Sequence, residues 1–89
     1  MEKEKIELTT ELTRDYIKMF DKAFAAGQID RCNQVESQYD AKMIRLGVDP
    51  AELHECVVEA EENSRPIREG VMDYFRACSN RPVAVRKSA

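Results

Sequence analysis

The residues in this chain whose types could do chemistry together are His54 and Cys56. Histidine can serve as a base or a metal ligand, and cysteine as a nucleophile or a metal ligand. Two residues apart on a helix, they point to different faces, so one metal ion would also need Cys32 or Cys78 from elsewhere. A cysteine nucleophile also needs hydrogen-bond donors for an oxyanion, and the sequence offers no Ser/Gly-rich loop that could supply them. The sequence therefore predicts that the protein is not an enzyme and holds no metal and no cofactor.

Three carboxylates form a second candidate site. Glu55, Glu59 and Glu62 recur at helical spacing, so they share one face of a helix. A di-metal bundle would also need a facing Glu-x-x-His element, which the chain lacks. Two interpretations remain: a face that is merely hydrated, or a negative patch that docks on a basic partner, as a mimic of nucleic acid would.

Charge is unevenly distributed along the chain, although the net charge is only −3. Residues 49–62 contain acidic side chains and no Lys or Arg. Beyond residue 74 the charged residues are all basic: Arg76, Arg81, Arg86 and Lys87. The pattern predicts an acidic helix followed by a short basic tail.

Residues 23–36 can be compared with a helix-turn-helix motif, which would bind DNA. Ala23 and Gly27 have the separation that the turn of this motif requires. Asn33 and Glu36, however, stand where its second helix should be apolar, and no cluster of Lys and Arg is available for phosphates. Nucleic-acid binding is therefore the alternative function rather than the first.

The length of 89 residues predicts one domain with a modest core. Three widely spaced cysteines and the charged start MEKEK favour reduced thiols and a cytoplasmic protein without a signal peptide. No apolar run approaches the roughly 20 residues that a membrane span needs. The sequence thus predicts a protein with no membrane association.

The first half of the chain predicts an antiparallel helical hairpin. We expect a helix capped by Thr9 or Thr10 that ends at Gly27, and a second helix that ends at Gly47. Each would be about 25–28 Å long at 1.5 Å per residue. The expected organisation is a flexible N-terminal arm at 1–9, a helical bundle at 10–79 and a disordered basic tail at 80–89.

A third helix has the clearest start signal. Asp49 is the expected N-cap, with Pro50 in the first helical position and Glu52 completing a capping box. Val48 and Leu53 have the spacing of a hydrophobic staple. Apolar or small residues then recur at alternating intervals of four and three, as on a helix that packs against other helices: Leu53, Val57, Ala60, Ser64, Ile67, Val71, Tyr74 and Cys78.

Pro66 interrupts this stripe and leaves two architectures open. An unbroken helix would be about 45 Å long and would overhang the hairpin. In the first architecture the helix is kinked or broken near Pro66, with Ser64 capping a fourth helix that folds back on the hairpin. In the second it continues, bent, and a second copy of the chain buries the overhang.

The sequence thus predicts an all-α fold, a three- or four-helix bundle built on the hairpin, with a last helix kinked or broken near Pro66. The expected core is Leu12, Tyr16, Phe20, Phe24, Ile29, Cys32, Tyr39, Leu53, Val57, Ile67, Val71 and Phe75. The predicted function is a non-enzymatic regulator or inhibitor, such as a phage- or plasmid-type inhibitor of a host nucleic-acid-handling system. It would bind a partner protein through an acidic face and an apolar patch, and a homodimer is expected as one possibility. The predicted partner-binding residues are Glu55, Glu59, Glu62, Tyr74 and Phe75.

Overall fold

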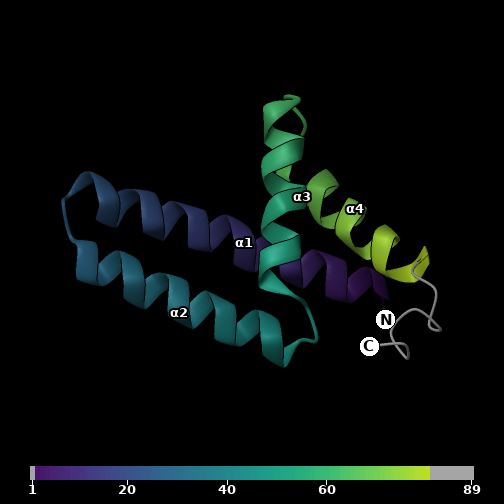
Figure 1. Ribbon diagram of the computed structural model, residues 1–89, viewed down its shortest axis with the longest axis horizontal. Coiled ribbons are helices and arrows are strands. Elements are labelled where there is room, and N and C mark those ends of the chain that lie inside the picture. Colours follow the sequence, from purple (N-terminus) through teal and green to yellow (C-terminus); the bar gives the residue numbers. More distant parts are fainter. Residues whose placement is uncertain (1, 81–89) are drawn as a thin grey trace.

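The computed structural model describes residues 2–80, which form four helices (Figure 1). They are α1 (Glu2–Ala25), α2 (Ile29–Arg45), α3 (Pro50–Glu62) and α4 (Ile67–Asn80). The described residues contain no strand, so the predicted all-α class is confirmed. Residue 1 and most of the predicted basic tail, residues 81–89, lie outside the described residues.

Helices α1 and α2 lie side by side and antiparallel, and α3 crosses them (Figure 1). Gly27 and Gly47 end the two helices as predicted, with φ of 72° and 80°. The Gln28 N–H donates to the Ala23 carbonyl at 2.9 Å, and the Val48 N–H donates to the Met43 carbonyl at 2.8 Å. These are the bonds of a Schellman motif, which places its left-handed residue directly after the helix.

The end of α3 repeats this motif with serine in the left-handed position. Ser64 has a φ of 60°, and the Arg65 N–H donates to the Ala60 carbonyl at 2.8 Å. The predicted role of Ser64 as the N-cap of a fourth helix is wrong, because Ser64 closes α3 and α4 begins only after Pro66.

Replacing Ser64 with glycine is expected to stabilise the protein by about 1 kcal/mol, because glycine adopts positive φ without a steric cost. Urea denaturation measures the change. Ser37 is a matched control, since it is exposed inside α2, where the same substitution should destabilise by about 0.5–1 kcal/mol. A Ser64→Gly variant no more stable than the parent chain would contradict this account of the turn.

The N-terminal turns of α1 support α4. Thr9 and Thr10 do not cap the helix as predicted: both are inside it and buried, at 0% and 1% exposure. Of the residues assigned to an N-terminal arm, 2–9 form the first turns of α1, and α4 packs against α1 as well as α3. Glu7 accepts a hydrogen bond from Arg68 Nε at 3.1 Å. The longer α1 therefore gives the second half of the apolar stripe a surface within the same chain.

The core lies where α3 and α4 pack on this end of the hairpin. Met43, Leu53 and Val71 are fully buried at its centre. Phe24 and Ile29 are not in the core as predicted, with 65% and 58% of their surface exposed. The reason is that α3 and α4 cover only one end of the hairpin, so the tip around Gly27 protrudes (Figure 1). The radius of gyration of 14.2 Å exceeds the roughly 12 Å of a compact chain of this length.

The start of α3 is fixed by three hydrogen bonds of Asp49. Asp49 accepts hydrogen bonds from the Ala51 N–H at 3.0 Å and from the Glu52 N–H at 3.4 Å, which confirms the predicted N-cap. The Asp49 N–H donates to the Tyr74 phenol at 2.8 Å. Tyr74 on α4 therefore holds the first turn of α3 in place.

High pH is expected to destabilise the fold through Tyr74. Burial, reinforced by Cys78, raises the pKa of Tyr74 from 10.0 to about 12. Because the folded chain keeps this proton more tightly than the unfolded chain, the contribution of Tyr74 to stability is constant below pH 10 and is lost as the pH rises from 10 towards 12. The fall should approach about 1.4 kcal/mol per pH unit. Urea denaturation on both sides of pH 10 measures it, and Tyr74→Phe should flatten the dependence; equal slopes in the two proteins would contradict the assignment.

Candidate functional site

A crevice separates the α1–α2 hairpin from α3. It consists of two cavities of about 230 Å³ and 410 Å³ that share Tyr16, Tyr39 and His54 in their linings. The smaller cavity lies between α1 and α3, and the larger one extends towards α2 and the first turn of α3. We call the two together the acidic crevice, for the carboxylates that line it: Asp21, Glu36, Asp40, Glu55 and Glu61.

Two stacked tyrosines form the floor of the acidic crevice. The ring centroids of Tyr16 and Tyr39 are 4.3 Å apart with the planes 18° from parallel. Tyr39 is held by a 2.8 Å hydrogen bond between its hydroxyl and that of Thr13. Tyr16 is half-buried, and burial raises its pKa, with Glu36 and then Asp40 adding to the effect. The phenols therefore stay neutral near pH 7 and present aromatic faces rather than bases.

The walls of the acidic crevice carry unbalanced negative charge. Among the described residues that line it there is no Lys or Arg. Arg65, Arg68 and Arg76 pair with carboxylates outside this lining, those of Glu7, Glu69 and Asp73. A concave surface lined by charges of one sign concentrates its field and attracts groups of opposite sign.

The sequence-based site is only partly assembled here. Glu55 lines the acidic crevice, whereas Glu59 and Glu62 are exposed on α3 outside the residues that line it. Tyr74 and Phe75 are 5% and 8% exposed and pack edge to face, 5.3 Å apart. Because they lie in the core of this chain, they do not form a surface patch.

Sequence reasoning missed the contribution of the hairpin to this site. Asp21 comes from α1, and Glu36 and Asp40 come from α2. The available signal was the i, i+4 spacing of Glu36 and Asp40, which places two carboxylates on one face of α2 beside Tyr39.

His54 and Cys56 do not combine into a catalytic pair. His54 is exposed and lines the acidic crevice, whereas Cys56 is half-buried. Burial raises the pKa of the Cys56 thiol, and the charge of Asp73 raises it further. Catalytic cysteines need a lowered pKa, so this environment opposes the thiolate. Across the part of the chain that is described, no group of three or more His, Cys, Asp or Glu side chains is arranged so that it could hold a metal ion.

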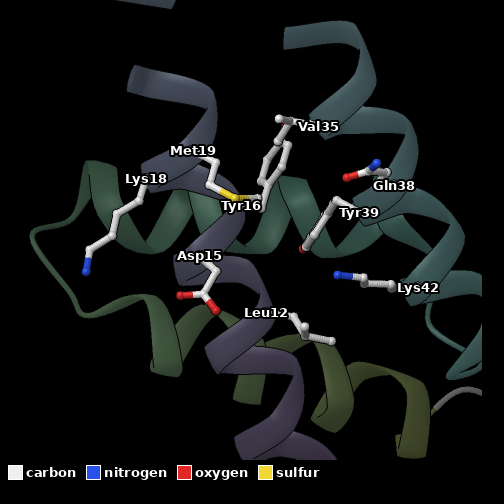
Figure 2. A pocket seen from close by; sticks show the side chains of 9 residues that line it. All are labelled: Leu12, Asp15, Tyr16, Lys18, Met19, Val35, Gln38, Tyr39 and Lys42. Atoms are coloured by element: carbon white, nitrogen blue, oxygen red, sulfur yellow. The ribbon is translucent and has the colours of Figure 1, made fainter. Parts of the chain in front are cut away.

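A second concave surface, the outer groove, lies between α1 and α2 on the other side of the hairpin. Figure 2 shows it with the ribbons of α3 and α4 behind the two helices. Its volume is about 300 Å³, and Tyr16 and Tyr39 separate it from the acidic crevice. The residues that line it are Leu12, Asp15, Tyr16, Lys18, Met19, Val35, Gln38, Tyr39 and Lys42.

Comparisons with known proteins give no indication of function. No family model matches the chain, and neither a curated protein nor a solved structure matches it. Among the described helices, none has both the length and the apolar composition that crossing a membrane requires.

Proposed function

We propose that this chain is a non-enzymatic interaction module that binds a basic segment of a partner protein in the acidic crevice. The observation that supports it is a lining that, within residues 2–80, has five carboxylates and no Lys or Arg, above a floor of stacked tyrosines. By covering a basic surface of its partner, the chain would act as a regulator or inhibitor. Glu59 and Glu62, exposed on α3, extend the negative surface beyond the crevice.

Arginine is the partner side chain that fits this site best. Its guanidinium group forms two parallel hydrogen bonds with a carboxylate and stacks on aromatic faces. In the acidic crevice, Glu36, Asp40 and Glu55 offer carboxylates around the larger cavity, and Tyr16 offers a ring. A cation over an aromatic ring contributes about 0.5–2 kcal/mol, depending on how far it is desolvated. Charge then accounts for attraction, and the tyrosine floor for a preference for arginine over lysine.

Nucleic-acid binding, the alternative function, has less support from the described residues. Phosphate recognition needs clustered basic side chains that are free to make contacts. Arg65, Arg68 and Arg76 each pair with carboxylates of this chain. The concave surface next to α3 has the opposite charge to the one that phosphates require.

A calorimetric titration with an arginine-rich peptide tests the proposal. We expect binding in the micromolar range that weakens as salt is added, because exposed charges are screened over about 10 Å at 0.1 M salt. A peptide of the same sequence with citrulline in place of arginine is the control, since it keeps the shape and loses the charge. Equal binding of the two peptides, or no binding of the arginine peptide at low salt, would contradict the proposal.

A further inference from the structure

The outer groove lies on a face of the hairpin that α3 and α4 leave uncovered. Leu8 and Met19 of α1 are 45% and 42% exposed, and Leu12 between them is half-buried. Intervals of four and seven residues place these three side chains on one stripe of α1. A helical hairpin buries apolar stripes only against another layer, and α3 and α4 supply that layer on one side.

The charged residues beside this stripe, Asp15 and Lys18, are placed so that each could pair with the other residue of a second copy of α1. Along α1, the outward-facing residues follow in the order Leu12, Asp15, Lys18, Met19. In an antiparallel copy of α1 centred at Tyr16, Leu12 lies opposite position 20 and Asp15 opposite position 17. Met19 and Lys18 are therefore each within one residue, about 1.5 Å along the helix, of the side chain that they face. Within residues 2–80, neither Asp15 nor Lys18 has an ion-pair partner.

We propose that a second copy of this chain packs on the outer groove, with its α1 antiparallel to α1 and Asp15 of each copy paired with the partner's Lys18. The two-fold axis passes at the level of the Tyr16–Tyr39 stack. The two α2 helices are then antiparallel as well, and Val35 lies beside the methylene stem of the partner's Lys42. The contact between Val35 and this lysine is favourable, because it brings no two like charges together and buries the apolar part of the lysine side chain.

This dimer differs from the one that the sequence suggested. There, the second copy was expected to bury the far half of the last helix. In the structure, Val71 and Phe75 of α4 are buried within their own chain, at 0% and 8% exposure. The outer groove and the acidic crevice lie on opposite sides of the Tyr16–Tyr39 pair, so a dimer leaves both crevices open. Two basic segments can then bind to one dimer.

Sedimentation equilibrium with charge-swapped variants tests this interface. We expect the parent chain to reach twice its 10.2 kDa mass at high micromolar concentration. Asp15→Lys and Lys18→Asp should each raise the dimer Kd about tenfold or more, because two-fold symmetry repeats each pair. The double variant Asp15→Lys/Lys18→Asp should restore the parent Kd to within about threefold. An equimolar mixture of the two single variants should form a heterodimer more tightly than either variant self-associates.

Glu59→Lys is the control, since it makes the same charge change as Asp15→Lys on an exposed residue of α3 outside the outer groove. It should leave the dimer Kd unchanged. A parent chain that is monomeric at all concentrations overturns the proposal, as does a dimer that neither single variant weakens. Loss of the dimer in both single variants without rescue in the double variant also overturns the pairing. Circular dichroism of each variant shows whether the helices are intact.

Discussion

Replacing Gly70 with valine is expected to prevent stable folding. Gly70 is buried where α4 crosses α3, and a Cβ atom at this position would lie 2.8 Å from both the Cys56 carbonyl oxygen and the Val57 Cα. It would also lie 3.2 Å from the Ala60 Cβ. Two of these three neighbours are backbone atoms of α3, which cannot move aside without separating the two helices. Glycine is therefore required by the close approach of the helices rather than by the backbone conformation.

Gly70→Ala adds only the Cβ atom, so the folded chain should persist and its loss of stability can be measured. Alanine has the better helix propensity by about 1 kcal/mol, and overpacking a core costs about 1–3 kcal/mol. Because overlap with backbone is at the costly end of that range, we expect a net loss of about 1–2 kcal/mol in urea denaturation. Glu69→Ala is the matched control, since Glu69 is the exposed preceding residue. It loses only a solvent-exposed ion pair with Arg65, so stability should change by at most about 0.5 kcal/mol. A Gly70→Ala variant as stable as the parent would show that α3 and α4 are not this close.

The second large effect concerns binding of a basic peptide to the acidic crevice. The double variant Glu36→Lys/Glu55→Lys is expected to raise the Kd of the arginine-rich peptide by about 100-fold or more. It leaves three of the five carboxylates in the crevice and adds two ammonium groups that repel the peptide. Both residues are exposed, so the fold should tolerate the change. Calorimetric titration at about 0.1 M salt, where exposed charges are screened, measures the affinity, and circular dichroism shows whether the helices are intact.

A control of equal net charge distinguishes the site from charge alone. Glu4 and Glu11 are exposed on α1 and do not line the acidic crevice. Glu4→Lys/Glu11→Lys should keep the peptide affinity to within about threefold, because neither residue lines the crevice and charges that do not contact the ligand are screened over about 10 Å at 0.1 M salt. If this control weakens binding as much as the crevice variant does, general electrostatic attraction is sufficient and the proposed site is contradicted.

Local signals in the sequence were sufficient to predict where three of the helix ends lie. Gly27, Gly47 and Asp49 occupy the capping positions that their types favour, and these depend on only a few neighbouring residues. Ser64 was misassigned because serine favours N-caps, whereas the end of α3 needs a left-handed residue whatever its type. The exposed Phe24 and Ile29 were misassigned because an apolar stripe does not reveal how far along a helix its partner extends.

The candidate site was harder to foresee because it is made of residues far apart in the chain. The acidic run on α3 was visible in the sequence, but only Glu55 and Glu61 of that run line the acidic crevice. The other carboxylates reach it because α3 crosses the hairpin, and a crossing angle depends on packing rather than on local pattern. Tyr74 and Phe75 were expected in an apolar surface patch, but the packing of α4 against both α3 and the long α1 buries them.

Nuclear magnetic resonance titration of the parent chain with the arginine-rich peptide tests the central claim most directly. Tyr16 and Tyr39 border both concave surfaces, so the decisive signals come from residues that line only one of them. The acidic crevice predicts saturable shifts of the Ala51 and His54 resonances, with little change at Met19 and Gln38 of the outer groove. Shifts confined to Met19 and Gln38, or spread evenly over the acidic residues of all four helices, would contradict the claim that the crevice is the binding site.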